Sequence, residues 1–491
     1  MKKLKINPDK KISHINREIY GHFSEHLGYC IYGGLYVGED SDIPNINGVR
    51  KDVIDALKEI KIPVLRWPGG CFAEEYHWED GIGKKSERPV RINTCWGGVE
   101  ETNAFGTHEF FNLCEELGCE PYLAANMSGG TVWEMQSWIE YITYDGNSEL
   151  ARKRKQNGRE KPWKLKYIGV GNENWGGGGN MRPEFYADEY RKYQTFCKDY
   201  SGNHLYKIAC GAGDGNYDWT KKVIENIKWT NPYGISLHHY SLPTGNWDKK
   251  GSAVKFPDSE YYHTIQDAMY MDELIKKHGE IIRSLEKEDN PIALIVDEWG
   301  VWCDVEEGTN PGFLYQQNSM RDAVVAALTL NIFNKNSDIV KMANLAQTVN
   351  VLQSVILTDG KEILKTPTFY VFKMFAPHQD NDLVESELQN EKIADTQALT
   401  HSVSVNGEGE LFVTFSNASL DKSFEIEFDI ASEEKYSVSD CEILTAKKED
   451  CNTFEDREKV ISKAYDGYND NNGQISVSLP PVSVVCLKLN K

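Results

Sequence analysis

The sequence lacks the features that mark membrane, nucleic-acid and nucleotide-binding proteins. No stretch approaches the roughly 18 consecutive apolar residues that a membrane-spanning helix needs. Basic residues are few: 54 Lys and Arg stand against 75 Asp and Glu, giving a net charge of −21 that repels nucleic acids and anionic membranes. No GxGxxG follows the first predicted strand, and no lysine stands in P-loop position after the four glycines 176–179. We therefore expect neither nucleic acid nor a membrane as a partner.

Cysteine is present, but without the spacings that hold metals. The 11 cysteines are an odd number, scattered from Cys30 to Cys486, and none forms a CxxC pair. The histidines show no HExxH or comparable ligand spacing. The N-terminal lysines are not followed by an apolar segment, so no signal peptide is expected. These features predict a cytoplasmic protein with reduced thiols, no metal and no other cofactor.

Eight short apolar runs alternate with amphipathic segments over residues 17 to 350. The runs are REIYGHF (17–23), PVLRWPGG (63–70), EPYLAAN (120–126), KYIGVGNE (166–173), KIACGAG (207–213), GISLHHY (234–240), IALIVDEWG (292–300) and IVKMANLAQ (339–347). Segments with helical periodicity separate them, such as 107–118, where four apolar side chains share one face. Eight strand–helix units predict an α/β fold, a (β/α)8 TIM barrel. A doubly wound open sheet is the alternative.

The pattern changes after about residue 365. Segments such as LFVTFSN (411–417) and FEIEFDI (424–430) alternate apolar and polar residues, which is typical of half-buried antiparallel strands. They predict a C-terminal β-sandwich of the jelly-roll kind. We place the barrel at 17–355 and the β-sandwich at 366–491, and expect residues 1–16 to contribute a strand to the sandwich.

Two glutamates stand out among the polar residues that end the predicted barrel strands, where barrel enzymes carry their working groups. Glu173 lies in GNENWGGGGN (171–180) and Glu298 in DEWG, on the fourth and seventh strands. A glutamate at a strand end is more often part of a loop salt bridge, but two on facing strands favour catalysis. Paired carboxylates hydrolyse glycosides, with retention at a separation of about 5 Å and inversion at roughly 6.5–9.5 Å.

Other strand-end residues suit the neighbourhood of such a pair. Arg66 is placed to keep one carboxylate ionised, and Tyr240 to orient Glu298 through its hydroxyl. Asn172 is placed to donate to a sugar hydroxyl. Aromatic faces suited to stacking on a sugar come from Trp96, Trp175, Trp299 and Trp302.

Six ordered motifs together resemble the α-L-arabinofuranosidases of glycoside hydrolase family 51. They are IYGHFSEHLGYCIYGGLY, VLRWPGGCFAEEYHWEDGIG, GNENWGGGGNM, SLHHYSLPTGNWDKKGSA, DEWGVW and ANLAQTVNVLQ. The resemblance covers essentially the whole chain. It implies a (β/α)8 barrel with a jelly-roll domain, a retaining mechanism, no cofactor, and a homo-oligomer that in this family is often a hexamer.

The resemblance also implies the roles of individual residues. Glu173 matches the acid/base and Glu298 the nucleophile, with Arg66 and Tyr240 holding that nucleophile. The sugar pocket is implied to comprise Glu25, Cys71, Asn172 and Gln347, with Trp96 and Trp302 as aromatic walls. The chain departs from the common pattern at Gly177, where relatives often carry cysteine, and at Ser24, where they often carry an apolar residue. Both departures bear on loop stiffness and specificity rather than on the reaction.

The sequence thus predicts an exo-acting α-L-arabinofuranosidase that releases terminal arabinofuranose from arabino- or arabinoxylo-oligosaccharides. A glycosidase of the same family acting on β-xylosides or β-glucans is one alternative. A sugar-binding protein without turnover is the other.

Overall fold

The computed structural model describes residues 1–471 and 473–491. Its centre is a closed parallel barrel in the order β10-β11-β12-β13-β2-β5-β8-β9. The strands are β2 (Gly21–Phe23), β5 (Val64–Trp67), β8 (Glu120–Ala125), β9 (Tyr167–Val170), β10 (Tyr206–Gly213), β11 (Gly234–Ser241), β12 (Ala293–Val301) and β13 (Val340–Ala346). Each coincides with one of the eight predicted runs, so the (β/α)8 prediction is confirmed and the open sheet is wrong.

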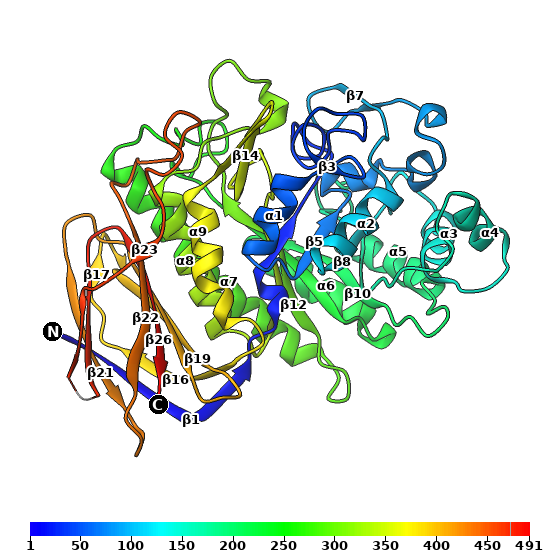
Figure 1. Cartoon of the computed structure of the whole chain (residues 1–491). Helices are drawn as coiled ribbons and strands as arrows, with labels where there is room; N and C mark the ends of the chain where they lie inside the picture. The colour runs from blue at the N-terminus through cyan, green and yellow to red at the C-terminus, as the bar shows by residue number, and fades with distance from the viewer. Residues whose placement is uncertain (472) are drawn as a thin grey trace.

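Helices surround the barrel (Figure 1). They are α1 (Lys51–Glu59), α2 (Thr107–Leu117), α3 (Val132–Thr143), α4 (Glu149–Gln156), α5 (Pro183–Phe196), α6 (Tyr217–Ile227), α7 (Asp258–Leu285), α8 (Met320–Lys335) and α9 (Pro367–Phe375). Local signals explain several ends: Pro183 opens α5, and Gly118 ends α2 in the left-handed conformation at φ 69°. Among the described residues, no helix has the length and apolarity needed to cross a membrane.

One predicted strand is shorter than expected. The run 17–23 begins with a 3-10 helix, η1 (Arg17–Tyr20), and only Gly21–Phe23 forms a strand. Before α1, β3 (Asn45–Ile46) and β4 (Val49–Arg50) form a hairpin whose two turn residues, Asn47 and Gly48, both have positive φ.

A layer of large side chains fills the barrel near the starts of its strands. Tyr122, Tyr167, Ile208 and Ile295 are all buried in one cluster there. Because this layer closes the bottom, the barrel is a packed core that opens only at the carboxyl ends of its strands.

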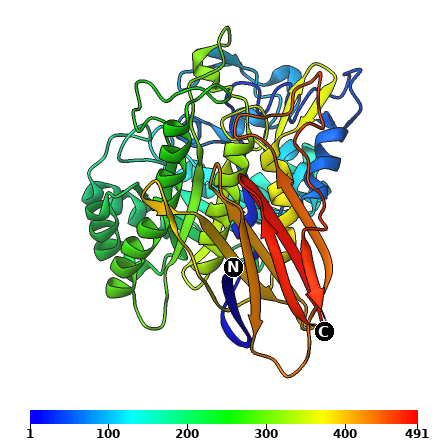
Figure 2. The ribbon, with the colours of Figure 1, turned by 90° about the vertical axis from the view of Figure 1, so that its left-hand side faces the viewer.

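The second domain is a ten-stranded sheet in the order β23-β22-β26-β20-β19-β16-β1-β21-β25-β24. Its strands are β1 (Lys2–His14), β16 (Asp382–Leu388), β19 (Leu399–Val405), β20 (Leu411–Asn417), β21 (Phe424–Ile430), β22 (Ser437–Thr445), β23 (Lys463–Ala464), β24 (Tyr468–Asn471), β25 (Gln474–Leu479) and β26 (Ser483–Asn490). β25 also contacts β20 and β26, which are not its hydrogen-bonded neighbours, so the sheet folds over into two layers (Figure 2). β1 lies inside it, antiparallel to β16 and parallel to β21.

Helices α8 and α9 lie between the barrel and the sheet domain (Figure 1). Buried amide side chains of α8 join the two: Asn331 Nδ2 donates to Thr400 Oγ1 at 2.9 Å, and Asn334 Nδ2 to Ser402 Oγ at 3.0 Å. Buried polar groups that are paired in this way hold two surfaces in one register. The domain boundaries at 17–355 and 366–491 stay predictions.

Candidate active site

The two glutamates lie together at the open end of the barrel. Glu173 follows β9 and Glu298 lies on β12, and a side-chain oxygen of each falls within 4.8 Å of the other. Two carboxylate oxygens this close can reach the same sugar carbon, as the shorter carboxyl separation known for glycoside hydrolysis requires.

Glu298 is fixed by two donors and is only 6% exposed. Arg66 Nη1 donates to its Oε1 at 2.8 Å, and the Tyr240 hydroxyl donates to Oε2 at 2.8 Å. Burial alone would lower the pKa of Arg66, but the Asp297 and Glu298 carboxylates outweigh burial and raise it, so the guanidinium stays charged. A Cβ on Gly70 would lie 2.7 Å from Glu298 Oε1, which explains a glycine at this position. The two donors, one of them charged, hold the Glu298 carboxylate in a single orientation.

Glu173 sits on a loop in a left-handed conformation, with φ 42°. Its Oε1 is 2.8 Å from His238 Nδ1, while its Oε2 faces the Cys71 thiol at 3.6 Å. A Cβ at Gly177 would come within 2.8 Å of Cys71 Sγ, so the glycine that replaces the common cysteine gives this thiol its space. One carboxylate oxygen is thus held by a ring nitrogen, and the other meets only a weak donor.

His238 lies between three carboxylates. Its Nε2 is 3.1 Å from Asp297 Oδ1, and its Nδ1 is 3.5 Å from Glu298 Oε2 as well as 2.8 Å from Glu173. Burial would lower the pKa of His238, but the surrounding carboxylates, Glu298 first among them, raise it well above the usual value. The ring is therefore a cation at neutral pH, placed between the two glutamates.

Glu25 is a further buried carboxylate beside the pair, close to Glu298. Its carboxylate accepts hydrogen bonds from Trp96 Nε1 and from Gln347 Nε2, both at 2.9 Å. Burial and the nearby Glu298 raise the pKa of Glu25 to about 7. Asn172 accepts from Arg66 through Oδ1 at 2.6 Å, whereas its Nδ2 and the Gln347 Oε1 are buried without a protein partner. Because buried polar atoms are normally paired, these two are free for the hydroxyls of a ligand.

Aromatic rings line the outer part of the site. Trp96 and Trp302 are both partly exposed, and Trp302 packs edge-on against Tyr240 at 5.0 Å and against Trp247 at 5.3 Å. The prediction that Trp299 forms a wall is wrong: it is 1% exposed and packs against Phe333 in the layer between barrel and helices. Trp175 is half-buried, and its Nε1 donates to the Gly211 carbonyl on β10.

The structure thus brings the ten predicted site residues into one region of the barrel mouth, and it adds three that the sequence analysis did not select. These are His238, Asp297 and Glu74, all buried and all hydrogen-bonded to a predicted site residue or its neighbour. The signal for the first two was available, since each adjoins a predicted strand end. Glu74 gave no such signal, because it lies in a 3-10 turn, η2 (Cys71–Glu74), beyond β5.

Within the described residues, one group of His and Glu side chains has atoms close enough to share a metal ion: Glu173, His238 and Glu298. Both oxygens of Glu298 already accept hydrogen bonds, from Arg66 and Tyr240. The cationic His238 ring would have to lose its proton to bind a metal. The donor set therefore fits an acid–base pair better than a metal centre.

Comparisons with known proteins agree with this geometry. Residues 56–249 match the model of the "Alpha-L-arabinofuranosidase 1 domain", and residues 297–483 match that of the "Alpha-L-arabinofuranosidase C-terminal domain". A Bacteroides ovatus protein named "Intracellular exo-alpha-L-arabinofuranosidase" is 50% identical over 99% of this chain and 95% of its own length.

Solved structures of arabinofuranosidases match this chain over its full length. A family 51 arabinofuranosidase from Xanthomonas axonopodis pv. citri superposes with a TM-score of 0.96 at 42% identity, covering 100% of both chains. An α-L-arabinofuranosidase from Thermotoga maritima, solved as an arabinose complex, superposes with a TM-score of 0.88 at 30% identity, covering 99% of both. This chain belongs to the α-L-arabinofuranosidases of glycoside hydrolase family 51.

Proposed function

We propose that this chain is a retaining, exo-acting α-L-arabinofuranosidase that releases terminal arabinofuranose from arabino- or arabinoxylo-oligosaccharides. The observation that carries the proposal is the placement of the Glu173 and Glu298 carboxylates within 4.8 Å of each other at the mouth of the barrel. Glu25, Trp96 and Gln347 are joined side chain to side chain beside them. We infer that this wall limits the pocket to one terminal sugar, which is what exo action requires.

In the proposed reaction, Glu298 attacks C1 of the bound arabinofuranoside and forms a glycosyl-enzyme while the bond to the leaving oxygen breaks. Glu173 gives its proton to that oxygen, then takes a proton from the water that hydrolyses the intermediate. Its Oε2, which meets only the weak Cys71 thiol donor, is the oxygen that faces the substrate, because Oε1 is held by His238. Asn172 Nδ2 and Gln347 Oε1 meet sugar hydroxyls, and Cys71 lines the pocket.

The decisive experiment is a hydrolysis panel. Wild-type protein is incubated with aryl α-L-arabinofuranoside, aryl β-xyloside and aryl β-glucoside, and with arabino- and arabinoxylo-oligosaccharides of defined linkage. We expect arabinose alone to be released, with the α-anomer formed first by NMR. Xylose or glucose release would favour the related glycosidases, and binding without release would favour a sugar-binding protein.

The cellular setting and assembly are also proposed. The 50% identical Bacteroides ovatus relative is named intracellular, and this chain is proposed to work in the cytoplasm on imported oligosaccharides in arabinan breakdown. We further propose a homo-oligomer, a hexamer by likeness to the family. Light scattering on the purified protein would test this, since a monomer at about 55.9 kDa would contradict it.

Replacing His238 with asparagine should lower kcat/KM about 10- to 100-fold for an arabinofuranoside with a poor leaving group. The ring nitrogen Nδ1 lies 2.8 Å from Glu173 Oε1 and 3.5 Å from Glu298 Oε2, so its loss removes a contact that orients both carboxylates. The measurement is kcat/KM of wild type and variant with the same substrate. His239→Asn is the matched control, because His239 pairs with Asp214 instead. An unchanged kcat/KM in His238→Asn would refute the role given to the ring.

Chelation should leave the reaction unchanged. We expect dialysis against EDTA to alter kcat/KM by less than about twofold, because the proposed chemistry runs through carboxylates alone. Added Zn²⁺ should inhibit by binding Glu173, His238 and Glu298. Loss of activity on chelation, restored by a metal, would show that a metal takes part.

A further inference from the structure

The loop that carries Glu173 is held by a carboxylate that does not itself touch the pocket. Glu74 is 6% exposed, and both of its oxygens are fully used. Oε1 accepts from the Asn172 backbone N–H at 2.7 Å and from Asn174 Nδ2 at 2.8 Å. Oε2 accepts from the backbone N–H groups of Met127 and Ser128, both at 2.7 Å. One side chain therefore binds the residues on either side of Glu173 to the loop after β8.

The bonds continue around the glycine-rich segment. Asn174 Nδ2, oriented by Glu74, also donates to the Gly178 carbonyl at 2.6 Å, and Ser128 Oγ donates to the same carbonyl. A Cβ on Gly178 would lie 1.7 Å from the Asn172 carbonyl, so only glycine allows this close fold of the loop. The glycine-rich segment 176–179 is thus part of a closely packed, hydrogen-bonded loop.

This arrangement explains a conformation that needs external support. Glu173 has φ 42°, a region that costs a non-glycine residue free energy and persists only where surrounding contacts enforce it. Its two neighbours along the chain, Asn172 and Asn174, are the residues that Glu74 holds. Burial raises the pKa of Glu74, while its four N–H donors favour the charged form.

The same 3-10 turn reaches other parts of the site. Cys71 begins η2 and faces Glu173 Oε2, and the backbone N–H of Phe72 donates to Glu25 Oε1 at 3.1 Å. Contacts from three residues of one short turn, Cys71, Phe72 and Glu74, therefore connect the thiol, the Glu25 carboxylate and the loop of the acid/base.

We propose that Glu74 is a positioning residue for the acid/base: by clamping Asn172 and Asn174 to the loop after β8, it holds Glu173 in its strained backbone conformation and aims Oε2 at the leaving oxygen. The inference rests on the proposed function. Glu74 acts through Glu173, so its loss should damage proton transfer much more than sugar binding or nucleophilic attack.

The test is Glu74→Gln, which keeps the shape but puts an NH2 group against two N–H donors. We expect kcat/KM to fall about 10- to 100-fold for an arabinofuranoside with a poor leaving group and less than about threefold for a dinitrophenyl one. For the latter, kcat and KM should fall together, because Glu173 also acts as the base that activates water in the second step. Active sites are counted from the burst of dinitrophenol, so misfolded protein does not enter the rates.

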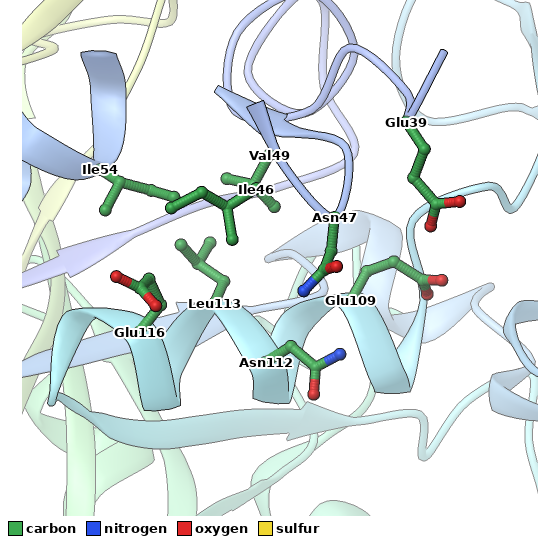
Figure 3. A pocket seen from close by; sticks show the side chains of 9 residues that line it. All are labelled: Glu39, Ile46, Asn47, Val49, Ile54, Glu109, Asn112, Leu113 and Glu116. Carbon is green, nitrogen blue, oxygen red and sulfur yellow. The ribbon is translucent and has the colours of Figure 1, made fainter. Parts of the chain in front are cut away.

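Glu109→Gln is the matched control. Glu109 lies on α2 and is another buried carboxylate, bound by Arg88. It lines a separate hollow of about 210 Å³ on the outside of the barrel (Figure 3). Its loss should cost stability without any dependence on the leaving group. If Glu74→Gln does not fold, Asn174→Ala removes the other half of the clamp and should show the same dependence.

Equal losses with both leaving groups, or no loss with either, would overturn the proposal. Failure of the proposed function looks different, since wild-type protein would then release no arabinose from any substrate.

Discussion

Replacing Glu298 with alanine should abolish hydrolysis of every arabinofuranoside, whatever its leaving group. The substitution removes the atom that forms the covalent bond to C1, and no other carboxylate replaces it: Glu173 is held by His238, and Asp297 is turned towards Tyr122, whose hydroxyl donates to it at 2.7 Å. We expect kcat/KM to fall on the order of 10⁴-fold or more, as for other enzymes that lose their nucleophile.

The loss can be assigned to the nucleophile in two ways. A 2-deoxy-2-fluoro arabinofuranoside with a good leaving group should add one sugar mass to the wild-type peptide that contains Glu298, and none to the variant. Azide should rescue the variant by entering the vacated space and give the β-arabinofuranosyl azide, because one displacement inverts C1. Unchanged folding by circular dichroism is the control. A variant that retains a tenth of its activity without azide would exclude Glu298 as the nucleophile.

The barrel was predictable because each buried strand and each amphipathic helix leaves its own hydrophobic pattern in a short stretch of sequence. Strands buried on both faces appear as continuous apolar runs, and β12 is buried at all nine positions. The same feature hides which residues point inward, because a fully buried strand shows no alternation of apolar and polar residues in its sequence. Trp299 therefore could not be told from a pocket residue by sequence, whereas in the structure it packs against Phe333 on the helix side of β12.

The pair of glutamates was predictable for a related reason. Strand ends in a parallel barrel meet at one rim, so residues far apart in sequence can be placed together from strand order alone. Strand order does not give contacts among side chains at that rim. The sequence analysis assigned no role to His238, and its distances to Glu173 and Asp297 are what place it in the site.

The role of Glu74 could not be predicted from the sequence. Glu74 lies in an irregular turn, and three of its four partners are backbone N–H groups, which every residue except proline carries. No residue type or spacing marks such a contact in a sequence. It becomes visible only when the loops after β5, β8 and β9 are placed in space.

Replacing Glu173 with alanine should separate substrates by their leaving groups. An arabinofuranoside with a sugar or phenol leaving group needs a proton as its bond breaks, so kcat/KM should fall by about 10²- to 10⁴-fold. A dinitrophenyl arabinofuranoside leaves as a stable anion, so its kcat/KM should stay within about tenfold of wild type. Its kcat should nevertheless fall, because the second step loses the base that activates water.

The different effects on kcat/KM and on kcat with one substrate can be measured directly. With dinitrophenyl arabinofuranoside the glycosyl-enzyme forms quickly and then accumulates, so kcat and KM should fall together and intact-protein mass should show the sugar adduct. Azide should restore kcat by attacking the intermediate without a base, and the product should be the α-azide, because two displacements retain the configuration. The anomer therefore separates Glu173→Ala from Glu298→Ala, whose rescued product is β. Equal loss of kcat/KM with both leaving groups, or a β-azide from Glu173→Ala, would exclude Glu173 as the acid/base and leave the barrel mouth without a proton donor at the leaving oxygen.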